Sequence, residues 1–286
     1  MSVPTGLATA DLLKIEAANG VTYAYRRFGA TGHGGPVLFL QHFRGNIDNW
    51  DPALIDAIAA EREVILFDNV GVGGTTGSTP DSVEGMASGA IAFVEALGLR
   101  RVDLFGFSLG GFVAQDVALS RPELVRRLVL AGTGPKGAPG MQAWPDDVVK
   151  RVVEPDAPGP EDVLYVFYTP TPTSQAAGQA SLGRIFARQQ GRDAETSPGA
   201  KNTQYHQAVL AWGVQDWDSL KRLAALAQPT LILQGDSDIM IPPKASHTMA
   251  GLIPDARIKI YPDASHGSIF QYAEEAAADT LAFLTE

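Results

Sequence analysis

The sequence contains no cysteine, so it can form neither disulfide bonds nor thiolate metal sites, and no thiol is available as a nucleophile. Histidine is also scarce, with five residues in 286, and no two histidines have the spacing of a metal-binding pair. We therefore expect a protein that works without a metal or another cofactor.

Positive charge and long apolar runs are lacking as well. The formal net charge is −10, which argues against nucleic acid or an anionic membrane as a partner. No apolar run approaches the ~20 residues that are needed to span a bilayer. Met1–Thr5 do not place a basic segment before an apolar one, so we expect no signal peptide and a cytoplasmic location. The oligomeric state does not follow from the sequence.

The sequence does contain short apolar runs that alternate with longer helical patterns. Such runs are typical of strands that are covered on both faces, as in a parallel sheet. Asn19-Gly20, between 11–17 and 21–28, predicts an antiparallel hairpin at the sheet edge. The alternation predicts the α/β class, with a doubly wound and mostly parallel sheet. We expect strands at 37–40, 64–67, 102–105, 128–130, 230–233 and 258–261, and helices at 51–61, 82–97, 110–120, 243–252 and 268–284.

One segment interrupts this alternation. Gly132–Gly140 is rich in glycine and proline, which is typical of a boundary, and only helical patterns follow it up to about Gly213. The length of the chain allows one domain with an insertion. We expect residues 134–214 to form a helical cap insertion, and residues 1–133 and 215–286 to form the core.

The most specific motif lies between a predicted strand and a predicted helix. Gly106–Gly110 read Gly-Phe-Ser-Leu-Gly, directly after the strand at 102–105. A serine on so sharp a turn needs neighbours two residues away that are almost without side chains. The turn would raise the Ser108 hydroxyl above the carboxyl ends of the strands, beside a helix N-terminus. This context predicts a nucleophilic serine rather than a passive one.

The arrangement resembles the α/β-hydrolase superfamily, and the resemblance extends from about residue 21 to residue 284. It is closest to small capped serine hydrolases, namely esterases, enol-lactone hydrolases and metal-free haloperoxidase-like enzymes. The resemblance implies the α/β-hydrolase fold, with a mostly parallel twisted sheet, helices on both faces and a helical cap. It also implies a serine hydrolase that needs no cofactor.

The superfamily order of serine, acid and histidine is matched as well. Asp238 follows a predicted strand, in a loop that resembles the acid loop of the family. Asp236 is the alternative acid, although it could instead bind amides of its own turn. His266 lies before the last predicted helix and matches the family's histidine. The resemblance therefore implies Ser108, Asp238 and His266 as nucleophile, acid and general base.

Two backbone N–H groups are expected to stabilise the negative oxygen of the reaction intermediate. One is the amide of Leu109, the residue after the serine. The other should come from the loop Gln41–Asn46, where Phe43 replaces the usual glycine of the family. By register this second donor is the Arg44 amide, with the Phe43 amide as the alternative.

The Arg44 side chain has two interpretations. It could point into the site and favour substrates that carry a carboxylate. Alternatively, it is a loop arginine that is solvated or paired with Asp48. We favour the second interpretation.

The triad predicts acyl transfer from a small carboxylic ester or lactone to water through an acyl-enzyme. Serine rather than aspartate at the turn disfavours the dehalogenase and epoxide hydrolase reactions of the superfamily. The same triad also serves metal-free haloperoxidases or perhydrolases and hydroxynitrile lyases, and a ligand receptor on a hydrolase scaffold is a third alternative. We expect a mostly apolar substrate of small or medium size, bound near Phe43, Phe107, Ile239 and Met240.

Overall fold

The structure is a computed structural model that describes residues 6–32, 34–188 and 190–286. Met1–Thr5, on which the expectation about a signal peptide rests, lie outside these residues. An eight-stranded sheet has the order β1-β2-β4-β3-β5-β6-β7-β8. Its strands are β1 (Leu13–Glu16), β2 (Thr22–Gly29), β3 (Val37–Leu40), β4 (Glu63–Phe67), β5 (Val102–Phe107), β6 (Val125–Ala131), β7 (Thr230–Gly235) and β8 (Ala256–Tyr261).

The strand directions agree with the antiparallel hairpin and the mostly parallel sheet that the sequence predicts. β1 pairs with β2 and β2 with β4 in antiparallel fashion, whereas the neighbours from β4 to β8 all pair in parallel. Every residue of β3 and β5 is buried, as expected for strands that helices cover on both faces. Gly20 forms the turn between β1 and β2 with a φ of 77°. The predicted fold class and edge hairpin are confirmed.

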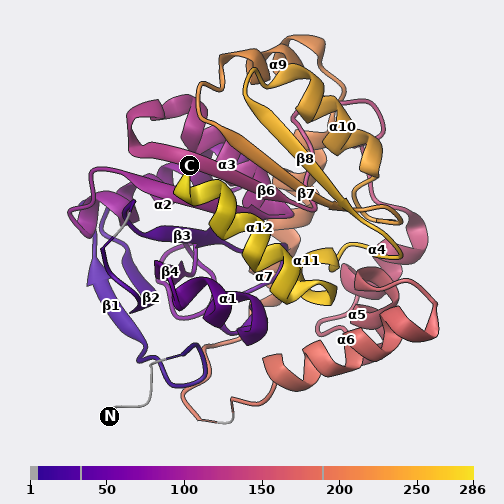
Figure 1. The fold of residues 1–286 in the computed structure, drawn as a ribbon, viewed down its shortest axis with the longest axis horizontal. Coiled ribbons are helices and arrows are strands. Elements are labelled where there is room, and N and C mark those ends of the chain that lie inside the picture. Colours follow the sequence, from indigo (N-terminus) through magenta and orange to yellow (C-terminus); the bar gives the residue numbers. More distant parts are fainter. Residues whose placement is uncertain (1–5, 33, 189) are drawn as a thin grey trace.

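Helices cover both faces of the sheet (Figure 1). Outside the segment between β6 and α9, they are α1 (Pro52–Ala59), α2 (Val83–Ala96), α3 (Leu109–Ser120), α9 (Trp217–Lys221), α10 (Pro243–Leu252), α11 (Ser268–Gln271) and α12 (Ala273–Thr285), with 3-10 turns at Ile47–Asn49, Pro122–Leu124 and Arg222–Ala225. On one face α1 packs against α12, and on the other α2 packs against α3. The predicted helix at 268–284 is interrupted at Tyr272, whose backbone is not helical and whose hydroxyl donates to the Pro262 carbonyl.

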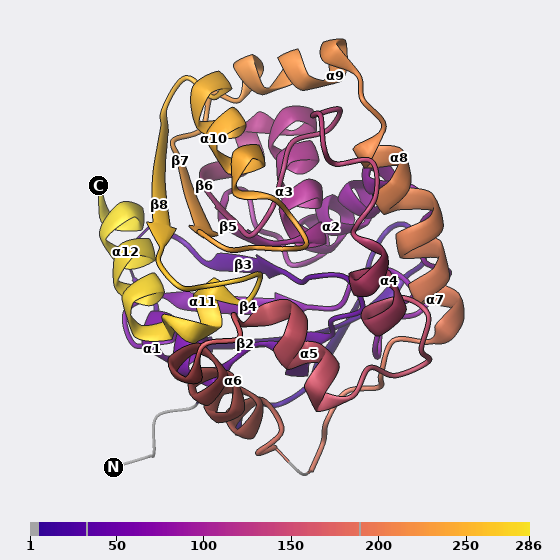
Figure 2. The same cartoon turned by 90° about the vertical axis from the view of Figure 1, so that its right-hand side faces the viewer.

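The regular elements between β6 and α9 are all helices in the described residues, and loops connect them. They are α4 (Asp146–Val152), α5 (Pro160–Phe167), α6 (Pro172–Ile185), α7 (Pro198–Thr203), a π-helical turn (Gln204–Val209) and α8 (Leu210–Gly213). Figure 2 shows α4, α5 and α6 next to one another on one side of the molecule, with α7 and α8 beside them. α6 also packs against α1 and α11, so this segment is joined to the sheet's helices.

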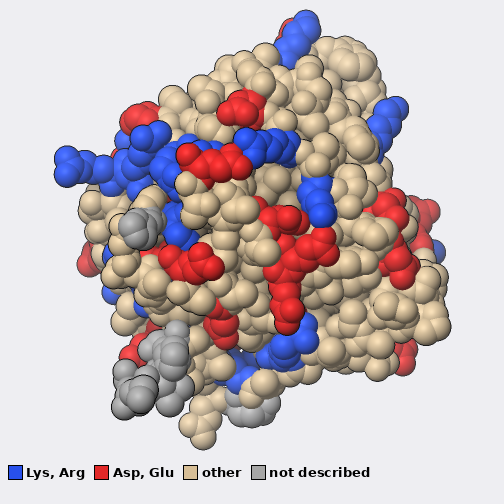
Figure 3. All heavy atoms as spheres, viewed as in Figure 1, with Lys and Arg blue, Asp and Glu red and all other residues tan. Residues whose placement is uncertain are grey.

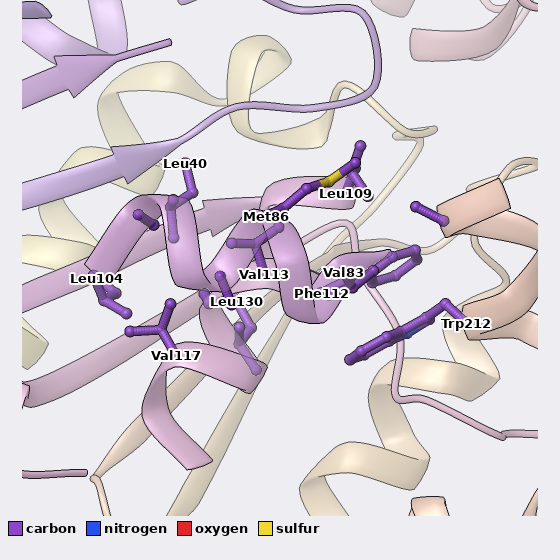
Figure 4. Close-up of a cluster of buried hydrophobic side chains, with 14 of the residues drawn as sticks. Leu40, Val83, Met86, Leu104, Leu109, Phe112, Val113, Val117, Leu130 and Trp212 are labelled. Carbon is purple, nitrogen blue, oxygen red and sulfur yellow. The ribbon is translucent and has the colours of Figure 1, made fainter. Parts of the chain in front are cut away.

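Apolar packing holds α3, the helix that begins after Ser108. Figure 4 shows Val113 and Val117 of α3 beside Leu130 of β6, and all three are buried. On its other side, Phe112 stacks on Trp212 of α8, with ring centroids 5.0 Å apart and an angle of 13° between the planes. The position of α3 therefore depends on the sheet and on the helical segment together.

The surface carries both signs of charge. On the face in Figure 3, acidic side chains lie over α12 and basic side chains gather toward the upper left. In residues 6–32, 34–188 and 190–286, no helix is both long and apolar enough to cross a bilayer. The expectation that the chain does not bind nucleic acid stays a prediction.

Candidate active site

Ser108 lies on the sharp turn between β5 and α3, in a strained backbone conformation with φ 55° and ψ −119°. The flanking glycines are required by backbone contacts. A Cβ at Gly106 would lie 2.5 Å from the Gly110 carbonyl oxygen, and a Cβ at Gly110 would lie 2.0 Å from the Leu40 carbonyl oxygen. No side chain fits at these distances, so the Gly-x-Ser-x-Gly pattern follows from the close packing of α3 against β3.

His266 bridges Ser108 and Asp238. Its Nε2 lies 2.9 Å from Ser108 Oγ, and its Nδ1 lies 2.8 Å from Asp238 Oδ2. All three residues are buried. Because a carboxylate oxygen can only accept, Nδ1 carries the proton and Nε2 can accept from the serine hydroxyl. The structure thus brings together the three residues that the sequence predicts as nucleophile, base and acid.

Further donors orient the Asp238 carboxylate. Its Oδ1 accepts from the amides of Met240 at 2.8 Å and Ile241 at 2.9 Å. Its Oδ2 accepts from Gln234 Nε2 at 3.0 Å, in addition to His266. Gln234 is fully buried in β7, and the sequence analysis did not identify it. A glutamine in an apolar strand signals a buried polar contact, but its partner is visible only once the loop after β7 has folded back over it.

Two phenylalanine rings flank His266. The centroid of its ring lies 5.2 Å from that of Phe107 and 5.4 Å from that of Phe167. Phe167 ends α5, and its carbonyl accepts from the Gly267 amide at 2.8 Å. The helical segment after β6 therefore forms one wall beside the histidine.

The predicted donors for the negative oxygen are only partly available. The amides of Leu109 and Phe43 have no hydrogen-bond partner within the described ranges of the chain. Leu109 is the first residue of α3, where an N–H has no partner within the helix. The Arg44 amide, in contrast, donates to Gln204 Oε1 at 2.9 Å. The Gln204 side chain thus occupies the amide of Arg44, the first candidate for the second donor, whereas the amide of Phe43, the alternative candidate, is unoccupied.

The Arg44 side chain is partly buried and is not paired with Asp48. Asp48 instead forms a buried ion pair with Arg26, at 3.1 Å. The guanidinium of Arg44 donates to three backbone carbonyls at and after the end of α4, those of Val152 (3.1 Å), Pro155 (2.8 Å) and Asp156. Burial lowers the pKa of Arg44, although the side chain keeps its charge because an arginine pKa lies far above neutral pH.

A second histidine, His42, lies beside the triad, and the sequence analysis gave it no role. Its Nδ1 lies 2.7 Å from the Phe43 carbonyl oxygen, so this nitrogen carries the proton and donates. Its ring packs against Phe107 and Phe167, with centroids 5.4 and 5.5 Å away. The same two phenylalanine rings therefore pack against both His42 and His266. Burial lowers the pKa of His42 to about 4, which keeps the ring neutral at neutral pH.

A cavity of about 410 Å³ borders Ser108 and His266. Apolar residues of the helical segment, including Val163, Leu182 and Ile185, form much of its wall. Of the four predicted substrate-binding residues, Phe43 and Met240 line this cavity. Phe107 does not line it, because its ring lies behind His266 and His42. Ile239 does not line it either and is 37% exposed, because its neighbours Asp238 and Met240 turn inward.

No group of three or more His, Asp or Glu in the described part of the chain could hold a metal ion. A buried pair of carboxyl groups, Asp68 and Asp193, lies between the loop after β4 and the segment after α6. Burial, and then the neighbouring Asp193, raise the pKa of Asp68 well above its usual range. Burial therefore favours the protonated form of Asp68.

Comparisons with known proteins agree with the fold. A family model described as alpha/beta hydrolase fold matches residues 35–272. A poly(3-hydroxyalkanoate) depolymerase from Ectopseudomonas oleovorans is 30% identical over 88% of this chain and 84% of that protein. A non-heme haloperoxidase from Rhodococcus erythropolis is 27% identical over 94% and 98% of the two chains. An alpha/beta hydrolase fold protein from Chitinophaga pinensis has a solved structure with a TM-score of 0.91, at 36% identity over 98% of this chain and 99% of that one.

Proposed function

This chain belongs to the α/β-hydrolase family, and we propose that it is a serine hydrolase that cleaves a small carboxylic ester or lactone. The observation that carries the proposal is the continuous path of hydrogen bonds from Asp238 through His266 to Ser108. A serine hydroxyl is a poor nucleophile unless a base takes its proton, and His266 is positioned to do so.

The reaction proceeds in two halves. Ser108 Oγ attacks the carbonyl carbon of the substrate, its proton passes to His266 Nε2, and the carbonyl oxygen becomes negative. Asp238 keeps His266 in the accepting tautomer and stabilises the imidazolium. His266 then gives this proton to the leaving oxygen, the bond between the carbonyl carbon and that oxygen breaks, and the acyl group stays on Ser108. Water then attacks the acyl carbon and gives a proton to His266. The bond between the acyl carbon and Ser108 Oγ breaks, His266 returns this proton to Oγ, and the acid is released.

We assign the amides of Leu109 and Phe43 as the donors to the negative oxygen. Both amides lack a hydrogen-bond partner among the described residues, and both residues flank the serine, Leu109 in sequence and Phe43 across the cavity. Leu109 is also at the positive end of the α3 dipole, which favours a negative charge nearby. Donors of this kind are worth about 10²–10³ in kcat each.

We further propose that residues 134–214 act as a cap on a core formed by residues 1–133 and 215–286. The cap supplies apolar walls to a cavity of about 410 Å³, a size typical of sites for small molecules. A mostly apolar cavity of this size supports a small or medium ester or lactone rather than a polymer. The similarity to a protein named for poly(3-hydroxyalkanoate) makes that polyester the substrate to test against this proposal.

A second reaction is supported by the similarity to a non-heme haloperoxidase over 94% of the chain. Hydrogen peroxide could replace water as the nucleophile that attacks the acyl-enzyme, and the product would then be a peracid. Bromination of a dye in the presence of acetate, bromide and peroxide measures this reaction. Absence of bromination, with ester hydrolysis intact, would leave hydrolysis as the activity.

The test of the proposal is labelling of the nucleophile. A fluorophosphonate should modify Ser108 with one label per chain, identified by mass spectrometry of peptides. Ser108→Ala should take up no label and lose several orders of magnitude in ester hydrolysis, with an unchanged melting temperature. Labelling at another residue, or an active and folded Ser108→Ala variant, would contradict the proposed function.

A further inference from the structure

We propose that Arg44 is a positioning residue through which the cap sets the geometry of the oxyanion donors. The inference rests on the proposed function, because it concerns the Phe43 amide that we assign as one of these donors. It concerns neither the nucleophile nor the substrate.

The backbone of Arg44 adopts a conformation that its residue type disfavours. Its φ is 65°, in the left-handed region, where an amino acid with a side chain is uncommon. Arg44 is the third residue of a turn that the hydrogen bond from the Gly45 amide to the His42 carbonyl closes at 3.0 Å. A positive φ at this position normally goes with glycine or asparagine. An arginine there needs contacts from elsewhere in the fold to hold it.

These contacts come from the cap. The Arg44 amide donates to Gln204 Oε1 at 2.9 Å, and the Arg44 carbonyl accepts from Thr196 Oγ1 at 2.6 Å. Gln204 is buried and begins the π-helical turn, a type of irregular helix that is frequent at functional sites. Both backbone groups of Arg44 are therefore bound by cap side chains.

The Arg44 guanidinium also joins the turn to the cap. It donates to carbonyls of Val152, Pro155 and Asp156, which lie at the end of α4 and in the cap loop after it. Lys201 also donates to the Pro155 carbonyl, at 3.2 Å, and so ties α7 to the same segment. Every hydrogen bond of Arg44 within the described residues ends on the cap.

The consequence concerns the Phe43 amide, which belongs to the peptide between His42 and Phe43 in the same turn. Phe43 is the second residue of the same turn, so the direction of its N–H depends on the turn conformation that Arg44 completes. Arg44, Asp156 and Thr196 also line the cavity. The same hydrogen bonds therefore hold the cap beside the cavity and hold the turn in its conformation. If the cap moved away, the turn would lose these bonds and the Phe43 amide would be misplaced.

Three variants and a transition-state analogue test this inference. Arg44→Ala removes the guanidinium, Arg44→Lys keeps a charged donor, and Gln204→Leu removes the acceptor of the Arg44 amide. Each is measured for kcat, KM and melting temperature with a short nitrophenyl ester. Each is also measured for the inhibition constant of a trifluoromethyl ketone, whose adduct with Ser108 carries a negative oxygen in the position of the intermediate.

The control is Arg184→Ala. Arg184 of α6 forms an ion pair with Asp51 at 2.6 Å, so it also ties the cap to the core, but it contacts neither the turn His42–Gly45 nor the cavity. Its loss should lower the melting temperature while kcat and ketone affinity stay within about twofold of the parent, since mutations outside the reacting site act mainly on stability.

We expect Arg44→Ala to lower kcat by about 10–100-fold, a fraction of the effect of deleting a donor. Ketone affinity should fall in parallel with kcat/KM, because both depend on the negative oxygen, while KM changes little. Gln204→Leu should behave similarly, and Arg44→Lys should recover part of the loss.

If the Arg44 variants lower the melting temperature but keep kcat and ketone affinity, the residue is merely structural. If Arg184→Ala loses as much kcat, a loosened cap rather than Arg44 is responsible. Failure of the parent to bind the ketone would contradict the proposed function itself.

Discussion

Asp236 and Asp238 lie in the same loop after β7, but their carboxylates bind different partners. Asp238 Oδ2 accepts from His266 Nδ1 at 2.8 Å. Asp236 Oδ1 accepts from Ser237 Oγ at 2.8 Å, and its Oδ2 accepts from the Asp263 amide at 3.1 Å. Asp236 thus fastens the loop that carries the histidine, while Asp238 contacts the imidazole ring itself.

Replacement of these two aspartates should therefore have unequal effects. Asp238→Asn should lower kcat by about 10⁴-fold, because an amide can donate to Nδ1 and leave His266 in the wrong tautomer. Asp236→Asn should cost far less, since only the anchoring of the loop is weakened. Rates with a nitrophenyl ester, together with melting temperatures, measure both. A larger loss for Asp236→Asn would make Asp236 the acid of the triad.

Substrate length should be limited by the cavity. Nitrophenyl acetate or butyrate should exceed the palmitate ester in kcat/KM by more than about tenfold, in a graded series, since each methylene is worth only about 1–3 kcal/mol in such a pocket. The same assay should include poly(3-hydroxybutyrate) particles, with release of acid as the readout. Faster cleavage of the palmitate ester or of the polyester would mean that the cap leaves the cavity open.

His42 should make the protein less stable in acid. Its pKa is about 4 in the folded chain against 6.5 for an ordinary histidine, so the unfolded chain binds more protons between these values. The stability that neutral His42 contributes is fully present above about pH 6.5 and is lost as the pH falls toward about 4, by about 3 kcal/mol in all.

The matched variant for this prediction is His42→Asn, which can still donate to the Phe43 carbonyl but does not titrate. Urea unfolding at about pH 5 and about pH 8 gives the free energy of unfolding of both proteins. The free energy of unfolding should decrease less on acidification in the variant than in the parent. Equal decreases would show that another group causes the loss.

Asp193→Asn should stabilise the protein increasingly as the pH rises through the folded pKa of Asp68. The pKa of Asp68 is raised by burial and by Asp193, so the folded chain keeps a proton that the unfolded chain releases. The contribution of the protonated pair to the free energy of unfolding is fully present at low pH and is lost as the pH rises through the folded pKa of Asp68. An asparagine at position 193 could donate a hydrogen bond to the ionised Asp68 carboxylate, so the pair would no longer need a bound proton. This hydrogen bond should raise the free energy of unfolding by about 1 kcal/mol. Melting temperatures from neutral to alkaline pH check this, and a constant difference across that range would contradict it.

Much of the fold and of the candidate site could be predicted because the signals are local. The strand β5, the glycines at positions 106 and 110 and the start of α3 are adjacent in sequence, and sterics at one turn explain all of them. Asp238 and His266 each follow a predicted strand, and the parallel sheet brings the carboxyl ends of its strands to one edge. Distant residues were therefore expected near one another without knowledge of their contacts.

The tertiary structure alone decided how the surrounding residues are used. Arg44 is bound by the helical segment between β6 and α9 and not by Asp48, its amide is occupied by Gln204, and burial keeps His42 neutral. These contacts join segments more than a hundred residues apart, as the separation of Arg44 from Gln204 shows. Strand and turn patterns follow from backbone sterics and apolar periodicity within a few residues, so the sequence determines them directly. The partner of a buried polar group is chosen only when the helical segment between β6 and α9 packs on the rest of the fold, because that packing removes water and leaves each donor the acceptor that lies nearest.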